Sequence, residues 1–106
     1  MSTEPAWTRA LAFDDVFQGD VIQLALEGRD LAVYGIDGTV HATDNTCTHG
    51  LARLCDGFLE GFEIECPMHQ GRFDVRTGVA TCAPAVSPIR VYPVKVEGGE
   101  VFIALD

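Results

Sequence analysis

Apolar residues in this chain form short runs that turn-forming segments separate. These runs predict β-strands over residues 7–11, 21–26, 31–36, 39–43, 58–60, 62–65, 72–75, 89–96 and 101–105. Residues 14–20 and 27–30 are turn-rich links, and no segment predicts a convincing helix. Asp37-Gly38 favours a tight hairpin because both positions of that turn need positive φ. Pro93, inside the run 89–96, indicates a sheet edge or a bulge. The pattern therefore predicts an all-β sandwich or barrel.

Length and charge limit the classes of protein to which the chain can belong. Its 106 residues suit one domain, residues 1–106, with a small core. The formal net charge of −9 argues against binding to nucleic acid or to anionic membranes, which need basic surfaces. It suits either solubility alone or association with basic protein partners. The first residues carry no export signal, so we expect a cytoplasmic protein whose cysteines are ligands or thiols rather than disulfides.

The charge is unevenly distributed along the chain. Between Asn45 and Cys82 there are five acidic and three basic residues, so most of the negative charge lies outside this segment. We therefore expect the acidic body to attract partners at long range and the nearly neutral segment to contact them.

Two short segments within residues 46–83 carry the candidate metal ligands. They are Cys47-Thr48-His49-Gly50 and Cys66-Pro67-Met68-His69, and sixteen residues separate His49 from Cys66. Each segment offers one thiolate and one imidazole, at a spacing that suits a loop rather than one face of a helix. Such a set suits zinc, or an iron–sulfur cluster in which two His replace two Cys on one iron. Residues 46–83 thus resemble a small insert that carries a metal.

Three kinds of metal centre compete for these residues. A structural zinc ion accepts two Cys and two His, but its usual spacing groups Cys with Cys and His with His. An all-cysteine cluster on Cys47, Cys55, Cys66 and Cys82 would need a spacing that differs from the common ferredoxin patterns. In a mixed-ligand [2Fe–2S] cluster, each segment gives one Cys and one His.

The two segments resemble the Rieske signature. Both local spacings, the glycine after His49 and the proline after Cys66 agree with it. The runs 52–57 and 71–75 add a narrower resemblance, to the soluble Rieske ferredoxins of bacterial aromatic-ring-hydroxylating dioxygenases of the naphthalene type. The resemblance extends over most of the chain.

This resemblance implies a fold, a cofactor and a role. The fold would be an antiparallel β-sandwich in which residues from about 46 to 83 form an inserted cluster-binding subdomain. Cys47 and Cys66 would bind the inner iron, and His49 and His69 the outer iron, of one Rieske-type [2Fe–2S] cluster per chain. The chain would carry single electrons from a flavin-containing, NAD(P)H-dependent ferredoxin reductase to the terminal oxygenase. It would be a monomeric electron carrier rather than an enzyme, and the oxygenase would select the aromatic substrate.

Two alternative functions stay open at this point. One is the small Rieske subunit of another reductase, such as a nitrite reductase, which reconstitution with candidate partners would distinguish. The other is a structural zinc-binding module for protein interaction, which the colour of the purified protein would distinguish.

Four positions depart from the respiratory Rieske proteins. The positions that carry a loop-linking disulfide in those proteins are Ala52 and Met68 here, and Gly71 and Phe73 replace hydroxyl residues that donate to the cluster sulfurs. Fewer donors stabilise the reduced cluster less, so we expect a reduction potential at the low end of the Rieske range, near roughly −150 mV.

Other residues have plainer interpretations. Cys55 and Cys82 could pair with each other, but buried core thiols are the interpretation that we favour. We interpret His41 as a surface or hydrogen-bonded residue rather than a ligand. We expect Leu51, Met68, Pro84 and Ala85 to form an apolar collar around the metal rather than ordinary core.

Overall fold

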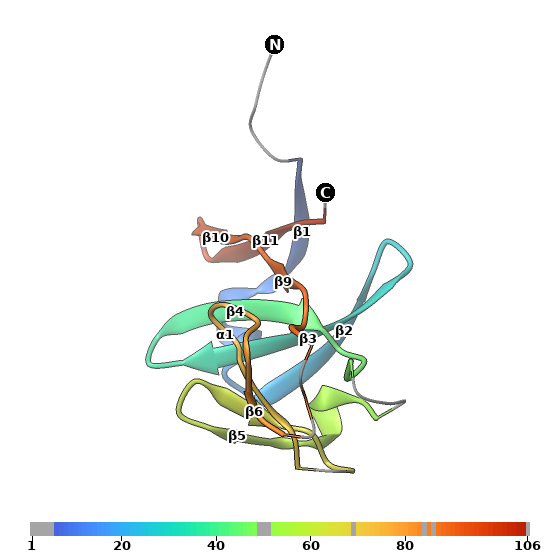
Figure 1. Cartoon of the computed structure of the whole chain (residues 1–106). Coiled ribbons are helices and arrows are strands. Elements are labelled where there is room, and N and C mark those ends of the chain that lie inside the picture. Colours follow the sequence, from blue (N-terminus) through green and yellow to red (C-terminus); the bar gives the residue numbers. More distant parts are fainter. Residues whose placement is uncertain (1–5, 49–51, 69, 84, 86, 106) are drawn as a thin grey trace.

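Strand β3 (Arg29–Ile36) lies in the middle of three stacked sheets and is buried on both faces over residues 31–34 (Figure 1). Its side chains alternate between two cores, as the period of a strand requires. Leu31 and Val33 enter a core shared with β1 and β11, whereas Ala32 and Tyr34 enter a core shared with the third sheet. The computed structural model describes residues 6–48, 52–68, 70–83, 85 and 87–105.

All three sheets are antiparallel and built from short strands. The central sheet has the order β2-β3-β4-β9, with β2 (Val21–Leu26), β4 (Thr39–Asp44) and β9 (Val91–Tyr92) beside β3. One flanking sheet has the order β1-β11-β10, with β1 (Trp7–Ala12), β11 (Glu100–Ala104) and β10 (Val94–Glu97). The other has the order β5-β6-β7-β8, with β5 (Phe58–Glu60), β6 (Glu63–Glu65), β7 (Arg72–Asp74) and β8 (Ala80–Cys82). The sandwich expected from the sequence is confirmed in these antiparallel sheets.

Two hairpins of the central sheet follow from local turn chemistry. Asp37 and Gly38 have φ values of 50° and 78°, so the turn expected there is confirmed. Glu27 and Gly28 also have positive φ, at 49° and 80°. The expected four-residue link over residues 27–30 is wrong, because Arg29 already pairs with Leu26 and only two residues form the turn.

Pro93 divides the expected strand 89–96 into two strands of different sheets. Val91 pairs with Thr43 of the central sheet, whereas Val94 pairs with Ile103 of a flanking sheet. A proline cannot donate to a ladder, and the two strands that it joins are both edge strands. The expected single strand over residues 89–96 is therefore wrong, whereas the expected edge position of Pro93 is confirmed.

Three short elements were missed. The link 14–20 contains α1 (Phe13–Val16), because fully buried Val16 anchors one turn of helix against the core. The segment before Gly57 contains η1 (Leu54–Asp56), where Leu54 is fully buried. Strand β8 has no apolar alternation of its own and forms by pairing with β7. No helix among the described residues has the length and apolar character that crossing a bilayer requires.

The segment 46–83 contains η1 and all four strands of the sheet β5-β6-β7-β8. It packs on the central sheet through Leu54, Ile64 and Phe73, which are fully buried. Its status as an inserted subdomain stays a prediction.

Candidate metal centre

The two candidate ligand segments begin in the same way. Cys47 follows β4 and Cys66 follows β6. The amide of Cys47 donates to the carbonyl of Ala52 at 2.8 Å, and the amide of Cys66 donates to the carbonyl of Gly71 at 2.7 Å. Each hydrogen bond closes a loop that begins at the cysteine, and the two loops contain the same number of residues. The chain thus holds both cysteines at the start of loops that the same kind of hydrogen bond closes.

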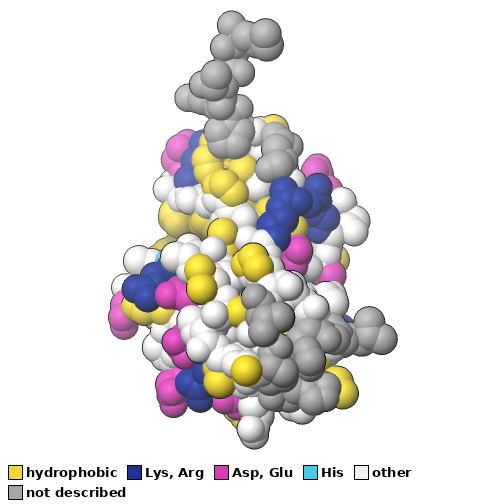
Figure 2. All heavy atoms as spheres, in the orientation of Figure 1, with side chains coloured by type: hydrophobic (Ala, Val, Ile, Leu, Met, Phe, Trp, Pro, Cys, Tyr) yellow, Lys and Arg dark blue, Asp and Glu magenta, His cyan; other side chains and the backbone are white. Residues whose placement is uncertain are grey.

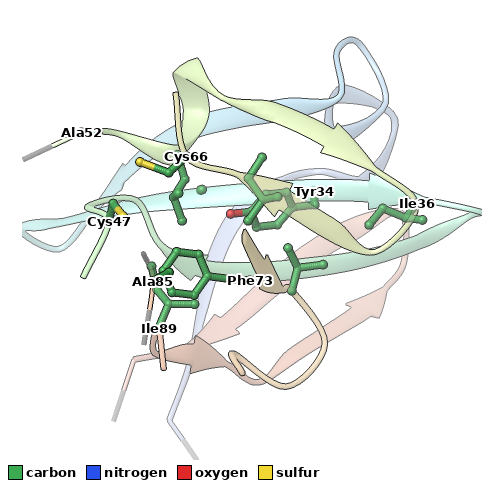
Figure 3. Close-up of a cluster of buried hydrophobic side chains, with 12 residues drawn as sticks. Tyr34, Ile36, Cys47, Ala52, Cys66, Phe73, Ala85 and Ile89 are labelled. Carbon is green, nitrogen blue, oxygen red and sulfur yellow. The ribbon is translucent and has the colours of Figure 1, made fainter. Parts of the chain in front are cut away.

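Both cysteine side chains lie in the core between the central sheet and the sheet β5-β6-β7-β8. Cys47 is 2% exposed and Cys66 is 1% exposed. Figure 3 shows the two side chains at the same end of the buried cluster, on the side where Ala52 lies. Two thiol groups that reach one end of an apolar cluster can bind one metal centre away from water.

His49 and His69 lie outside the described residues, so the complete ligand set stays a prediction. All four cysteines are described, and no group of three or more His, Cys, Asp or Glu that could hold a metal forms among the described residues. The all-cysteine cluster on Cys47, Cys55, Cys66 and Cys82 finds no support in this arrangement, because Cys82 is exposed and Cys55 is only partly buried.

Cys55 and Cys82 differ from the core thiols that the sequence led us to expect. Cys82 is exposed on β8, where it pairs with Arg72, and Cys55 is partly buried in η1. The two do not form a disulfide. The core assignment is wrong for Cys82, because β8 is an edge strand with little covering it.

Asn45 fixes the entrance to the first loop and is fully buried. Its side-chain amide lies 3.2 Å from both carboxylate oxygens of Asp30 and 3.3 Å from the sulfur of Cys55. Its side-chain carbonyl accepts the amide of Cys55 at 2.8 Å, and its backbone carbonyl accepts the amide of Leu54 at 2.6 Å. Asn45 thereby joins the start of β3, η1 and the segment leading to Cys47. The role of Asn45 was not predicted from the sequence, although its position two residues before Cys47 was an available signal.

The segment 85–89 packs against both loops. The hydroxyl of Thr48 donates to the carbonyl of Ser87 at 2.9 Å. A Cβ atom on Gly71 would lie 2.8 Å from the Cβ atom of Ala85. Ala85 is buried, so it belongs to the core rather than to the expected apolar collar, whereas Met68 is 63% exposed. Leu51 and Pro84, the other expected members of the collar, lie outside the described residues.

The outer face of the sheet β5-β6-β7-β8 carries a network of charged side chains beside exposed Phe58. Arg72 lies 3.1 Å from Glu60, 3.5 Å from Glu63 and 2.9 Å from Glu65, and hydrogen bonds to Glu60 and Glu65 raise the pKa of its guanidinium. Figure 2 shows acidic and basic side chains interleaved over the lower part of the molecule. This network sets one cation against three carboxylates, so the outer face of this sheet stays negative on balance.

His41 lies beside a groove of about 360 Å³ that Arg76 and Tyr92 also line. Its Nε2 atom lies 3.0 Å from the hydroxyl of Thr39, so its interpretation as a hydrogen-bonded residue is confirmed. Its ring meets that of Phe62 edge to face. Burial, followed by the charge of Arg76, lowers the pKa of His41.

The residues present fit a [2Fe–2S] group. Two buried thiols supply the soft ligands, and two loops closed in the same way present them from neighbouring segments. Gly71 lets its backbone approach the segment that packs over the site, because a side chain there would clash with Ala85.

Comparisons with known proteins agree with this geometry. Residues 6–93 match the model of the Rieske [2Fe-2S] domain family. The chain is 56% identical over 100 residues to the ferredoxin component of a naphthalene 1,2-dioxygenase system of Pseudomonas putida, covering 94% of this chain and 96% of that protein. It is also 51% identical over 100 residues to the ferredoxin component of a 2,4-dinitrotoluene dioxygenase system of a Burkholderia species, covering 94% of this chain and 96% of that protein.

Solved structures are similar over the same length. A ferredoxin of Sphingomonas yanoikuyae B1 superimposes with a TM-score of 0.89 at 43% identity, covering 95% of this chain and 100% of that one. A chain from a complex of reduced oxygenase and oxidized ferredoxin in a carbazole 1,9a-dioxygenase superimposes with a TM-score of 0.87 at 39% identity, covering 95% of this chain and 94% of that one.

Proposed function

This chain belongs to the Rieske [2Fe-2S] domain family, and we propose that it holds its cluster through Cys47, His49, Cys66 and His69. It is the electron-carrying ferredoxin component of an aromatic dioxygenase system, not the enzyme that oxidises the substrate. The observation that carries the ligand proposal is the pair of similarly closed loops that place two buried cysteines at one end of one core.

When bound, the cluster takes up and releases one electron at a time. The residues of the chain decide how that group is held. Cys47 and Cys66 would bind the inner iron, where burial excludes water. His49 and His69 would bind the outer iron. Met68, which is exposed between the second pair of ligands, offers an apolar contact to a partner.

The two partners follow from the relatives. We propose that a flavin-containing, NAD(P)H-dependent reductase supplies the electron and that the terminal oxygenase of an aromatic-ring dioxygenase receives it. The names of the relatives as ferredoxin components of dioxygenase systems support this role over a subunit of a nitrite reductase. Family membership favours iron–sulfur over the structural zinc alternative. A cytoplasmic monomer suits a carrier that meets two partners in turn.

The function is tested by reconstitution with the reductase and oxygenase of the naphthalene 1,2-dioxygenase system of Pseudomonas putida. We expect NADH to bleach the oxidised protein only when the reductase is present, and the oxygenase to restore the oxidised absorbance. A redox titration should give a potential near roughly −150 mV. A clearly positive potential, or a failure to exchange electrons with either component, would overturn the assignment.

A further inference from the structure

Two of the seven basic residues differ from the other five. Five form ion pairs with acidic side chains, and these are Arg9, Arg53, Arg72, Arg76 and Lys95. Within the described part of the chain, Arg29 and Arg90 form no ion pair, although the chain has 16 acidic residues. Both side chains are exposed. Two unpaired cations are unexpected in a chain with a net charge of −9.

The two unpaired arginines meet at one tyrosine. The guanidinium carbon of Arg90 lies 4.6 Å from the centre of the Tyr92 ring, and that of Arg29 lies 5.9 Å from it. Arg29 also donates to the hydroxyl of Tyr92 at 3.3 Å, and this hydroxyl donates to Asp44 at 2.5 Å. Tyr92 is buried, so its ring forms a rigid base for both guanidinium groups. Among the described residues, the carboxylate bonded to this unit is Asp44, and it accepts the hydroxyl of Tyr92.

The pair lies close to the first ligand loop. The amide of Asp44 donates to the carbonyl of Arg90 at 3.0 Å, and two residues separate Asp44 from Cys47 along the chain. Ser87, three residues before Arg90, accepts the hydroxyl of Thr48 in that loop. A partner that approaches the metal centre from this side would therefore meet the two arginines.

We propose that Arg29 and Arg90 together bind a carboxylate side chain of the terminal oxygenase, and this proposal rests on the function proposed above. A planar guanidinium matches a carboxylate through two parallel hydrogen bonds, and two exposed guanidinium groups on one base offer such a match. We assign the oxygenase because a solved relative occurs in a complex of oxygenase and ferredoxin. The acidic body attracts a basic partner surface, and the cationic pair fixes the orientation by taking one acid on that surface.

Long-range attraction by the acidic body and binding of one carboxylate by the arginines predict opposite effects of removing an arginine. Replacing an arginine with glutamine makes the chain more negative, which would strengthen long-range attraction to a basic partner. If Arg29 and Arg90 bind a carboxylate, the same replacement weakens the complex instead.

The test uses the holoprotein and the purified oxygenase of the naphthalene 1,2-dioxygenase system of Pseudomonas putida as the probe. Reoxidation of the reduced ferredoxin is followed at increasing oxygenase concentration in the wild type, Arg29→Gln, Arg90→Gln and the double variant. We expect each single change to raise the dissociation constant about fivefold and the double change to raise it about tenfold or more. Arg9→Gln, which removes the same charge on β1, should leave it unchanged or lower it.

Two further measurements separate docking from folding. The electron paramagnetic resonance spectrum and the thermal midpoint of each variant should match those of the wild type, and Arg29→Lys should recover part of the affinity. Equal losses in Arg9→Gln, unchanged affinity in the double variant, or an effect on reduction by the reductase alone would each overturn the proposal. Failure of the wild type to pass electrons to the oxygenase would instead overturn the proposed function, and this proposal with it.

Discussion

Gly71 and Ala85 lie so close together that a Cβ atom on Gly71 would come within 2.8 Å of the Cβ atom of Ala85 and 3.0 Å of its amide nitrogen. Gly71 closes the second ligand loop by accepting the amide of Cys66, and Ala85 belongs to the segment that also meets the first loop. The contact therefore joins the two halves of the metal centre. It also explains why a hydroxyl residue, which the respiratory Rieske proteins carry at this position, does not fit here.

Gly71→Ser is expected to lower the free energy of unfolding by about 1–3 kcal/mol, because the added Cβ atom overpacks the contact with Ala85. Thermal unfolding followed by the visible absorbance of the cluster measures the loss. Combining it with Ala85→Gly should recover part of it, so the double-mutant cycle should show a favourable coupling. Strictly additive losses would show that this contact does not limit position 71.

Asn45→Ala is expected to destabilise the first ligand loop by about 1–3 kcal/mol, since it leaves the partly buried amide of Cys55 without its acceptor. The rate of cluster loss at elevated temperature, followed by visible absorbance, measures the effect. Gln23→Ala is the matched control, because Gln23 also donates to Asp30, at 3.1 Å, but from the exposed face of β2. If both variants lose the cluster at the same rate, Asn45 does not hold the loop.

Serine substitutions are expected to show that two of the four cysteines are needed for cluster binding and that two are not. Cys47→Ser and Cys66→Ser are expected to abolish cluster binding, because each removes a buried thiolate that we propose as a ligand. Cys82→Ser is expected to keep the full iron content, since Cys82 is exposed on an edge strand. Cys55→Ser should also keep it, because its sulfur accepts the amide of Asn45 and donates to Asp56, and a hydroxyl can do both. Iron and sulfide analysis of the four variants measures this, and loss of iron in Cys82→Ser would contradict the site.

His41 is expected to titrate below its ordinary value of about 6.5, because burial and the charge of Arg76 both disfavour the protonated ring. Its contribution to stability is therefore complete above that value and is lost as the pH falls through the lowered pKa. A titration of the His41 ring by nuclear magnetic resonance measures the pKa. Arg76→Gln should raise it only in part, because burial remains the larger cause. A pKa at or above about 6.5 in the wild type would contradict the packing around Phe62.

The parts of the fold that were predicted correctly are those that local sequence determines. Asp37-Gly38 specifies its turn through the backbone conformations that its two positions need. The boundary at Pro93 was only half predicted, because a proline marks an interrupted ladder but does not reveal that the next residues join another sheet. Strand β8 was missed because pairing with β7, rather than its own pattern, forms it.

The candidate site likewise combines residues that the local sequence indicates with residues that only the fold brings together. Cys47 and Cys66 were predicted as ligands, together with His49 and His69, from the spacing of each cysteine from a following histidine, and that assignment stays a prediction. Asn45 and Arg29 were not predicted, because their partners Cys55 and Tyr92 lie 10 and 63 residues away in sequence. Exposure of Cys82 could not be read from the sequence either, since it follows from the edge position of β8.

Low-temperature electron paramagnetic resonance of protein purified without air and reduced with dithionite tests the central claim most directly. The account predicts a rhombic spectrum with the low average g value of a [2Fe–2S] cluster held by two Cys and two His. A higher average g value would require cysteine ligands alone and contradict the assignment of His49 and His69. A colourless, silent sample with stoichiometric zinc would contradict electron transfer itself.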